Sequence, residues 1–154
     1  MCGIFGVAIA KPADFKKNLI YDLVNSLYSF SETRGREAAG VATFNGNKLS
    51  LYKEALKATD FIKSKKFTKL LSDSVNDSVN FKNSFALIGH SRLVTNGAFS
   101  NNTNNQPLIT KNQIGVHNGI ITNESILWKN NGELKKETEL DSEILFKLID
   151  KEYL

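Results

Sequence analysis

The chain has a single cysteine, and it stands directly after the initiator methionine. Removal of Met1 would leave Cys2 with a thiol and a free α-amino group on one residue. Because an α-amine titrates at about pH 8 and a thiol at about pH 8.5, the amine could take the thiol proton and activate the sulfur as a nucleophile. A lone intracellular cysteine is more commonly a small buried apolar residue. The rest of the chain has to decide between the two interpretations.

Arginine is rare in this chain, although Lys and Arg together number 20. The arginines are Arg34 and Arg36, which flank Gly35, and Arg92, which precedes Thr95 by three positions. A chain that otherwise uses lysine can use arginine where a planar, bidentate fork must hold a carboxylate or a phosphate. The lysines form no basic stripe interleaved with aromatic residues, so the net charge of +4 does not predict a nucleic-acid partner.

The composition is that of one globular domain over residues 1–154, with 41% hydrophobic and 23% charged residues. No apolar run is long enough to cross a membrane, and the N-terminus lacks the pattern of a secretory signal. One cysteine excludes an internal disulfide framework, and two histidines with one cysteine fall short of a metal site. We therefore expect a cytoplasmic protein with no metal and no cofactor.

The apolar patterning predicts a mixture of strands and helices. Short apolar runs and the Asn-Gly turn at 45–47 predict strands at 3–10, 38–44, 48–52, 85–90 and 114–116. Helical spacing predicts helices at 15–30, 59–72, 123–130 and 141–152. The polar stretches at 72–83 and 95–106 should be loops. The strands are too apolar for a sheet with one wet face, so we expect helical layers to cover the sheets.

Four segments carry a resemblance to a known family when they are taken together and in order. They are MCGIFG at 1–6, SETRGREAAGVA at 31–42, GHSRLVTNG at 89–97 and VHNGIITN at 116–123. This set is similar to the glutaminase domain of class II (N-terminal cysteine) glutamine amidotransferases, most of all to the glucosamine-6-phosphate synthase and amidophosphoribosyltransferase branches. The resemblance implies an α+β fold, the four-layer αββα sandwich of N-terminal nucleophile hydrolases. It also implies an enzyme that releases ammonia from L-glutamine for an acceptor.

The resemblance assigns the catalytic roles. Cys2 would attack the side-chain amide of glutamine, with its own α-amine as general base and then as acid to the leaving ammonia. The Asn118 side chain and the Gly119 backbone N–H would hold the oxyanion, although this pair in isolation is also a plain hairpin turn. Cysteine is small enough to permit removal of Met1, so we expect a processed N-terminus.

Three further residues match substrate contacts of the family. Arg92 matches the arginine that binds the α-carboxylate of glutamine, and Thr95 matches a hydroxyl that contacts the substrate. Asp141 matches the acidic residue that accepts the α-ammonium group, although an acidic residue there could also serve as helix N-terminal charge compensation. The stretch 97–105 would correspond to a loop that closes over the bound amino acid.

The remaining motif residues have supporting roles by the same resemblance. Arg34 and Gly35 match an arginine-glycine pair that supports the nucleophile region. His90 and His117 could suggest a Cys–His dyad, but the resemblance makes both supporting residues, because the α-amine already supplies the base.

Departures from the family pattern leave the branch open. Leu93 and Asn96 stand where glucosamine-6-phosphate synthases commonly have Trp and His. The strands that normally follow the last helix are missing, as is an acceptor domain, so we expect a C-terminally incomplete sandwich. The partners implied are L-glutamine and an acceptor domain or partner chain, and a homo-oligomer is compatible with the sequence.

The leading interpretation is ammonia supply to amino-sugar synthesis. An amidophosphoribosyltransferase-type glutaminase of purine synthesis is the first alternative within the family. An N-terminal cysteine amidase acting on another amide, and a non-catalytic glutamine-binding or regulatory fragment, are the others.

Overall fold

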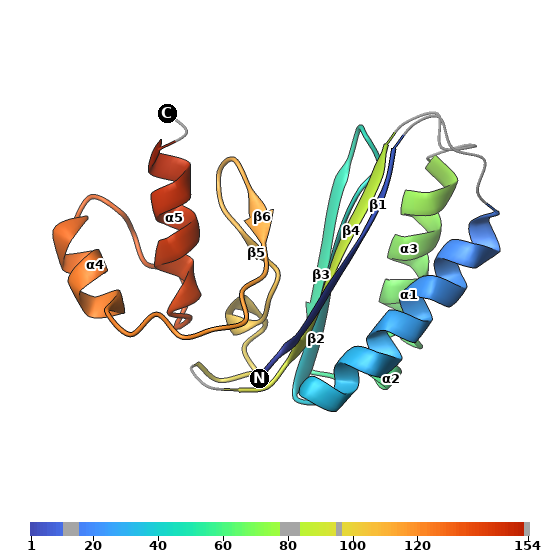
Figure 1. Cartoon of the computed structure of the whole chain (residues 1–154), viewed down its shortest axis with the longest axis horizontal. Helices are drawn as coiled ribbons and strands as arrows, with labels where there is room; N and C mark the ends of the chain where they lie inside the picture. Colours follow the sequence, from blue (N-terminus) through green and yellow to red (C-terminus); the bar gives the residue numbers. More distant parts are fainter. Residues whose placement is uncertain (11–15, 78–83, 95–96, 153–154) are drawn as a thin grey trace.

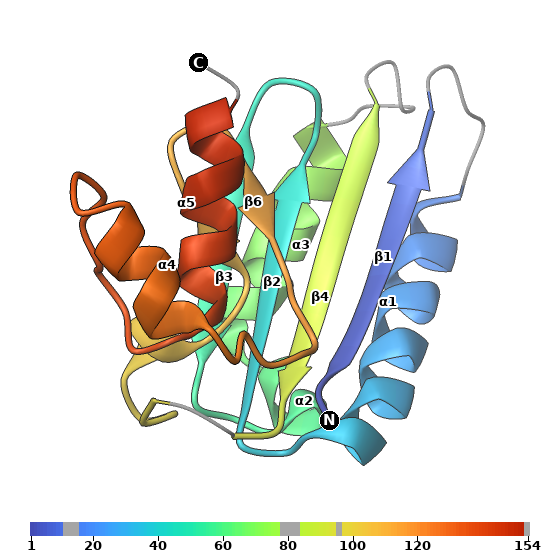
Figure 2. The ribbon, with the colours of Figure 1, turned by 60° about the vertical axis from the view of Figure 1, so that its left-hand side comes forward.

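A four-stranded antiparallel sheet stands between two groups of helices in the computed structural model, which describes residues 1–10, 16–77, 84–94 and 97–152 (Figures 1 and 2). The strands are β1 (Gly3–Ile9), β2 (Ala38–Phe44), β3 (Leu49–Glu54), β4 (Phe85–Arg92), β5 (Leu108–Ile109) and β6 (Ile114–Gly115). The helices are α1 (Lys17–Ser31), α2 (Ala58–Phe61), α3 (Lys65–Asp77), α4 (Glu124–Asn130) and α5 (Ser142–Glu152). The α+β class is therefore confirmed.

The main sheet has the strand order β1-β4-β2-β3, and α1, α2 and α3 cover one of its faces (Figure 1). Helix α1 forms where the sequence predicts a helix, because its apolar residues recur on one side. Ile20, Val24 and Tyr28 from that side are at most 1% exposed. The Tyr28 ring packs against aromatic rings of α2 and α3, and its hydroxyl donates to the Gly40 carbonyl at 2.7 Å. This core holds the helices against one face of the main sheet.

Two of the predicted elements need correction. The single helix expected over 59–72 is two helices, because the chain turns at 62–64 and the Ser64 hydroxyl accepts a hydrogen bond from Phe67 N–H near the start of α3. Helix α3 also continues through 72–77, which was expected to be loop, while 78–83 lie outside the described residues. The predicted hairpin between β2 and β3 is confirmed, with Gly46 at a φ of 88° in its turn.

Strand β1, expected to be buried, is an edge strand. Within the described part of the chain it pairs only with β4, and its burial alternates along the strand. An apolar run shows that a strand can be buried but does not show how many neighbours it has. The edge position leaves the N-terminus at one rim of the sheet, beside the end of β4 (Figure 2).

Strand β4 divides its side chains between the two faces. Phe85 and Leu87 belong to the core under the helices, so Ile88, His90 and Arg92 point to the opposite face, because successive strand residues alternate. That opposite face looks toward the β5–β6 ribbon, with α4 and α5 beyond it (Figure 1). Arg92 therefore lies on the face of the sheet that is turned toward the ribbon.

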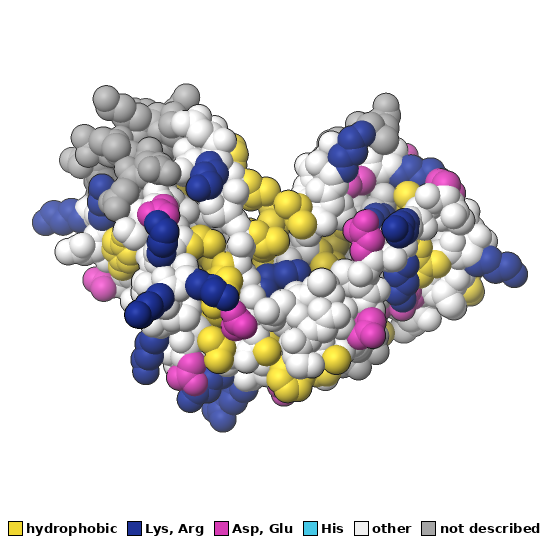
Figure 3. Space-filling model, turned by 180° about the vertical axis from the view of Figure 1, so that it is seen from behind, with side chains coloured by type: hydrophobic (Ala, Val, Ile, Leu, Met, Phe, Trp, Pro, Cys, Tyr) yellow, Lys and Arg dark blue, Asp and Glu magenta, His cyan; other side chains and the backbone are white. Residues whose placement is uncertain are grey.

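The layer over this second face is smaller than a four-layer sandwich requires. It is a two-stranded ribbon in the described residues, and Figure 3 shows a hollow with hydrophobic side chains on its floor. Phe44 and Leu49 on the sheet and Ile109 on the ribbon remain 42–50% exposed. The expectation that both faces would be covered is therefore only partly correct. None of the described helices has the length and apolarity needed to span a membrane.

Candidate active site

A cavity of about 330 Å³ lies where the N-terminus, the end of β4 and the turn after β6 meet. It holds every predicted catalytic residue and two of the predicted substrate contacts. Thr95 falls outside the described residues. The cavity is lined by Met1, Cys2, Arg92, Leu93, Gln106, His117, Asn118, Gly119, Ile120, Leu140, Asp141 and Ser142.

Asn118 holds the backbone of Cys2 from both sides. Its Oδ1 accepts from Cys2 N–H at 3.1 Å and its Nδ2 donates to the Cys2 carbonyl at 3.0 Å. The sulfur lies between the two backbone groups of Leu93, 3.4 Å from the N and 3.5 Å from the O. Residues 116 positions apart are thus joined by direct contacts. While Met1 is attached, the nitrogen of Cys2 is an amide and has no basicity to offer.

The turn that carries Asn118 presents two kinds of donor to the cavity. An asparagine amide has two N–H donors, and only one of those on Asn118 is engaged by Cys2. The N–H of Gly119 has no hydrogen-bond partner within the described ranges. A Cβ on Gly119 would lie 2.6 Å from His117 Nε2, so glycine is the residue that fits against this imidazole. The two donors are of the type that an oxyanion needs.

Gln106 fixes the start of this turn, and the sequence analysis missed it. Its Oε1 accepts from His117 N–H at 2.6 Å and its Nε2 donates to the His117 carbonyl at 3.1 Å. The Gln106 backbone in turn lies directly on Gly40 of β2, where a Cβ would come 2.0 Å from the Gln106 carbonyl oxygen. The turn is therefore tied to the main sheet through one amide side chain and one glycine.

Arg92 is 3% exposed, and its guanidinium is tied to the loop that follows β4. Nη1 donates to Asn105 Oδ1 at 2.7 Å and Nη2 donates to the Gly97 carbonyl at 2.8 Å. Burial lowers the pKa of Arg92, while the negative charges of Glu37 and Glu139 act in the opposite direction. Arg92 therefore holds both ends of the 97–105 loop, and its contact with a substrate carboxylate stays a prediction.

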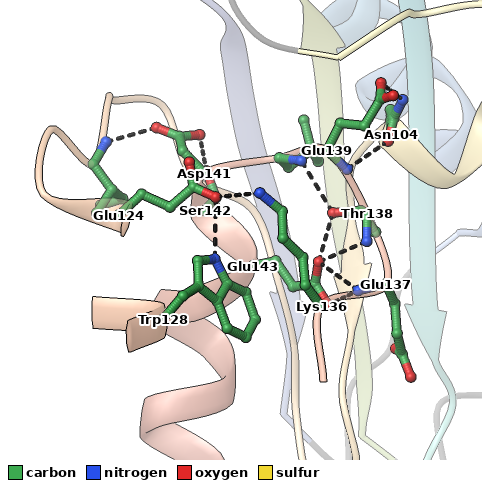
Figure 4. A network of polar contacts seen from close by, with 12 residues as sticks. Asn104, Glu124, Trp128, Lys136, Glu137, Thr138, Glu139, Asp141, Ser142 and Glu143 are labelled. Atoms are coloured by element: carbon green, nitrogen blue, oxygen red, sulfur yellow. Dashed lines mark hydrogen bonds and ion pairs between the residues drawn. The ribbon is translucent and has the colours of Figure 1, made fainter. Parts of the chain in front are cut away.

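Glu139 clamps the same loop from the other side, and it too was missed. Its Oε2 accepts from Ala98 N–H at 3.1 Å and from Asn104 Nδ2 at 2.6 Å, and its own N–H donates to Asn104 Oδ1 at 2.9 Å (Figure 4). The Asn-rich stretch 101–105 predicted a loop, but Asn104 and Asn105 are buried hydrogen-bonding partners rather than solvated turn residues, while Asn102 is half-buried and Asn101 is exposed.

Asp141 stands immediately before α5, and its carboxylate is bonded both to the first residue of that helix and to a separate segment of the chain. Oδ2 accepts from Ile121 N–H at 2.6 Å, and Oδ1 accepts from the Ser142 hydroxyl at 3.2 Å. The Ser142 Oγ also lies 2.8 Å from His117 Nδ1. Both Asp141 and Ser142 are at most 5% exposed. Charge compensation at the start of α5 does not fully describe this carboxylate, because Ile121, one of its two partners, lies on another segment.

The segment before Asp141 is held by a buried carboxylate of its own. Glu143 accepts from the Thr138 N–H at 2.7 Å, from the Thr138 hydroxyl at 2.9 Å and from the Glu137 N–H at 2.9 Å (Figure 4). Trp128 and Lys136 both donate to Glu124, which connects α4 to the same segment. This network fixes the approach of the chain to Asp141.

Arg34 and Gly35 are both near the nucleophile, but they differ in burial. Gly35 is buried against the end of β4, where a Cβ would lie 2.2–2.4 Å from backbone atoms of Arg92 and Leu93. The Arg34 side chain is exposed and borders a second hollow that Cys2 also lines. Gly35 therefore supports the strand end, and a supporting role for the Arg34 side chain stays a prediction.

Comparison with protein-family models gives no match. Among curated proteins, the chain is 29% identical over 167 residues to an amidophosphoribosyltransferase of Methanocaldococcus jannaschii, covering 100% of this chain and 30% of the relative. It is 30% identical over 161 residues to an amidophosphoribosyltransferase of Methanothermobacter thermautotrophicus, covering 99% and 30%. It is 33% identical over 155 residues to the glutamine–fructose-6-phosphate aminotransferase (isomerizing) of Bradyrhizobium diazoefficiens, covering 97% and 22%. The chain thus spans less than a third of the length of these relatives.

Proposed function

This chain is a distant homologue, over its whole length, of class II glutamine amidotransferase regions, and from that premise we propose that it releases ammonia from the side-chain amide of L-glutamine. The observation that carries the proposal is the meeting of Cys2 with the Asn118–Gly119 turn in one cavity. Arg92 and Asp141, which border the same cavity, supply the charges that an amino-acid substrate requires.

The reaction needs Met1 to be removed first. The free α-amine of Cys2 then takes the thiol proton, and the thiolate attacks the amide carbon of glutamine. Asn118 Nδ2–H and Gly119 N–H donate to the oxyanion of the tetrahedral intermediate. As the C–N bond breaks, the α-ammonium returns the proton to the leaving nitrogen, which departs as ammonia and leaves a thioester. Water then hydrolyses the thioester to glutamate and regenerates the thiol.

The contact between Cys2 N and Asn118 Oδ1 supports this order of events. The oxygen that now accepts the amide N–H would accept an N–H of the free amine in the same position. The amine would then remain beside its own sulfur without any rearrangement of the turn. His117, Gly35 and Arg34 act as supports of this arrangement, and Thr95 adds a hydroxyl contact to the substrate.

We assign the ammonia to an acceptor held by another domain or a partner chain, in amino-sugar synthesis or a related pathway. The alternative is an amidophosphoribosyltransferase-type reaction of purine synthesis. The similarity to the two kinds of relative is nearly equal, at 29–30% and 33% identity, so the identities do not separate the branches.

A matched set of N-termini tests the proposal. A cleavable N-terminal tag is used to prepare the chain with Cys2 exposed, with the tag retained, and with Cys2→Ala exposed, and the release of glutamate and ammonia from glutamine is measured. Only the first preparation should be active, because only it has both the thiol and the free amine. Ammonia release that survives Cys2→Ala would refute the mechanism, and release by the tagged chain would refute the role of the amine.

A non-catalytic glutamine-binding module is the second candidate. The observation in its favour is the two-stranded ribbon that stands where a full second sheet is expected. Calorimetry of the Cys2→Ala chain with glutamine distinguishes the two. Binding by this variant, together with no turnover by the chain with Cys2 exposed, would favour the module.

A further inference from the structure

The Asp141 carboxylate is a buried anion that is bonded to both ends of the oxyanion turn, 117–121. It accepts from Ile121 N–H at 2.6 Å directly, and it reaches His117 Nδ1 through the Ser142 hydroxyl. In the described part of the chain no Lys, Arg or His nitrogen forms an ion pair with it. A buried carboxylate without a cationic partner relies on its hydrogen bonds, so these contacts matter for both groups that they join.

We propose that Asp141 is a positioning residue for the oxyanion turn as well as the contact for the α-ammonium group of the substrate. The proposal rests on the glutaminase function and extends it, because recognition of the amino acid and alignment of the oxyanion donors then depend on one carboxylate. The class of substrate that satisfies both requirements is a side-chain amide that also carries an α-ammonium group.

The Ser142 hydroxyl donates to Asp141 and accepts from His117. The Ser142 hydroxyl has one proton, and an ionised Asp141 can only accept it. The remaining bond, between Ser142 Oγ and His117 Nδ1, therefore has the imidazole as donor. This places a proton on Nδ1 of His117, while Nε2 of the same ring lies against Gly119. Loss of the negative charge at Asp141 removes the reason for this direction of the Ser142 hydrogen bonds and loosens both ends of the turn.

A carboxylate has about four acceptor positions, and the two bonds within the protein leave capacity for a ligand on the cavity side. An α-ammonium group can therefore bind without breaking the Ile121 contact. A residue that touched only the ammonium would change the affinity for glutamine. A residue that also holds the turn would change the rate for any amide, including one without the ammonium group.

Asp150, on the helix α5 that begins directly after Asp141, provides a matched control. Its carboxylate also accepts backbone N–H bonds, from Lys111 at 2.8 Å and Asn112 at 3.2 Å, and it is 9% exposed. It does not line the cavity. Asp150→Asn therefore removes a comparable charge from comparable bonds without touching the proposed site.

The first measurement does not require turnover. Amide hydrogen exchange of the full chain is followed by NMR in the wild type, Asp141→Asn, Ser142→Ala and Asp150→Asn. Exchange at Ile121 should accelerate roughly tenfold in Asp141→Asn, because a hydrogen bond to a charged acceptor is weakened, and the Gly119 signal should shift. Asp150→Asn should affect the Lys111 and Asn112 amides and leave Gly119 and Ile121 unchanged. Exchange rates at Ile121 within twofold of wild type in Asp141→Asn would overturn the proposal.

The second measurement separates positioning from substrate binding. The chain with Cys2 exposed is assayed with glutamine and with its analogue in which hydrogen replaces the α-amino group. Asp141→Asn should lower kcat for the analogue by roughly tenfold or more, although the analogue has no ammonium to lose. Ser142→Ala should lower kcat for both substrates by a similar factor with little change in KM, and Ser142→Thr, which keeps the hydroxyl, should restore it.

The outcomes separate this inference from the function on which it rests. Equal turnover of the analogue by wild type and Asp141→Asn would overturn the positioning role while leaving the glutaminase intact. A wild-type chain that releases no ammonia from glutamine would refute the proposed function, and the exchange measurement would still decide whether Asp141 holds the turn.

Discussion

His90 should make the fold sensitive to acid. Its side chain is 1% exposed on the second face of β4, and neither ring nitrogen has a hydrogen-bond partner among the residues that the structure describes. Burial and the neighbouring positive charge of Arg92 lower the pKa of His90 to about 3, from an ordinary value of 6.5. His90 does not line the cavity, so its titration reports on the sheet beneath the site rather than on the chemistry.

The sign and size of the effect follow from this pKa. Between pH 6.5 and pH 3 the unfolded chain binds a proton at His90 and the folded chain does not, so the free energy of unfolding falls as the pH is lowered through this window. A pH of 4.5 is two pH units below the ordinary pKa of histidine. Protonation of His90 in the unfolded chain therefore lowers the free energy of unfolding by about 3 kcal/mol at this pH. Above pH 6.5 the two states hold the same number of protons at this residue, and the contribution to pH dependence disappears.

Urea unfolding of the wild type and of His90→Leu at pH 7.5 and pH 4.5 measures this contribution. All other titrating groups are shared, so the difference between the two pH-induced losses isolates His90. We expect the wild type to lose about 3 kcal/mol more than the variant. At pH 7.5 the two should be similar in stability, because an apolar side chain of similar size replaces a buried polar group without partners. Parallel losses in both proteins would refute the reasoning.

Two further substitutions examine how the oxyanion turn is attached to the sheet. Gly40→Ala places a methyl group 2.0 Å from the Gln106 carbonyl and should cost about 1–3 kcal/mol in urea unfolding, whereas Gly6→Ala meets its nearest atom at an ordinary 3.4 Å and should change little. Equal stabilities of these two variants would contradict the close approach. Gln106→Glu keeps the shape but cannot donate to the His117 carbonyl, so glutaminase kcat should fall roughly tenfold. Unchanged kcat would mean that this contact does not fix the turn.

The sequence patterns correctly predicted those elements that are stabilised by residues close to one another in the chain. Helix α1 and the β2–β3 hairpin formed where periodicity and the Asn-Gly turn placed them, because each is stabilised mainly by residues close in sequence. The break between α2 and α3 was missed because Ser64 reads as one more polar residue of an amphipathic stretch. The edge position of β1 was missed because strand neighbours are set by topology, which an apolar run does not encode.

The residues in and around the cavity also fall into those that the sequence could predict and those that it could not. The motif residues Cys2, Asn118 and Asp141 could be named from family resemblance, and the structure brings them to one cavity. Gln106 and Glu139 could not, because their partners are backbone groups of other segments and any polar side chain at those positions reads as part of a loop. A Gln directly before Pro, at the end of an Asn-rich stretch, was the only signal available for Gln106.

Side chains hold the oxyanion turn because the ribbon before it is too short to do so. Strands β5 and β6 have two residues each, and a pair of that length is not stable by itself. Donors stabilise a developing charge only if they are fixed before the reaction. Gln106 supplies that constraint at the first residue of the turn and Asp141 at the last, and both anchors are buried. The rigidity that the proposed reaction requires therefore comes from two polar side chains, and a substitution at either should impair ammonia release more than it destabilises the fold.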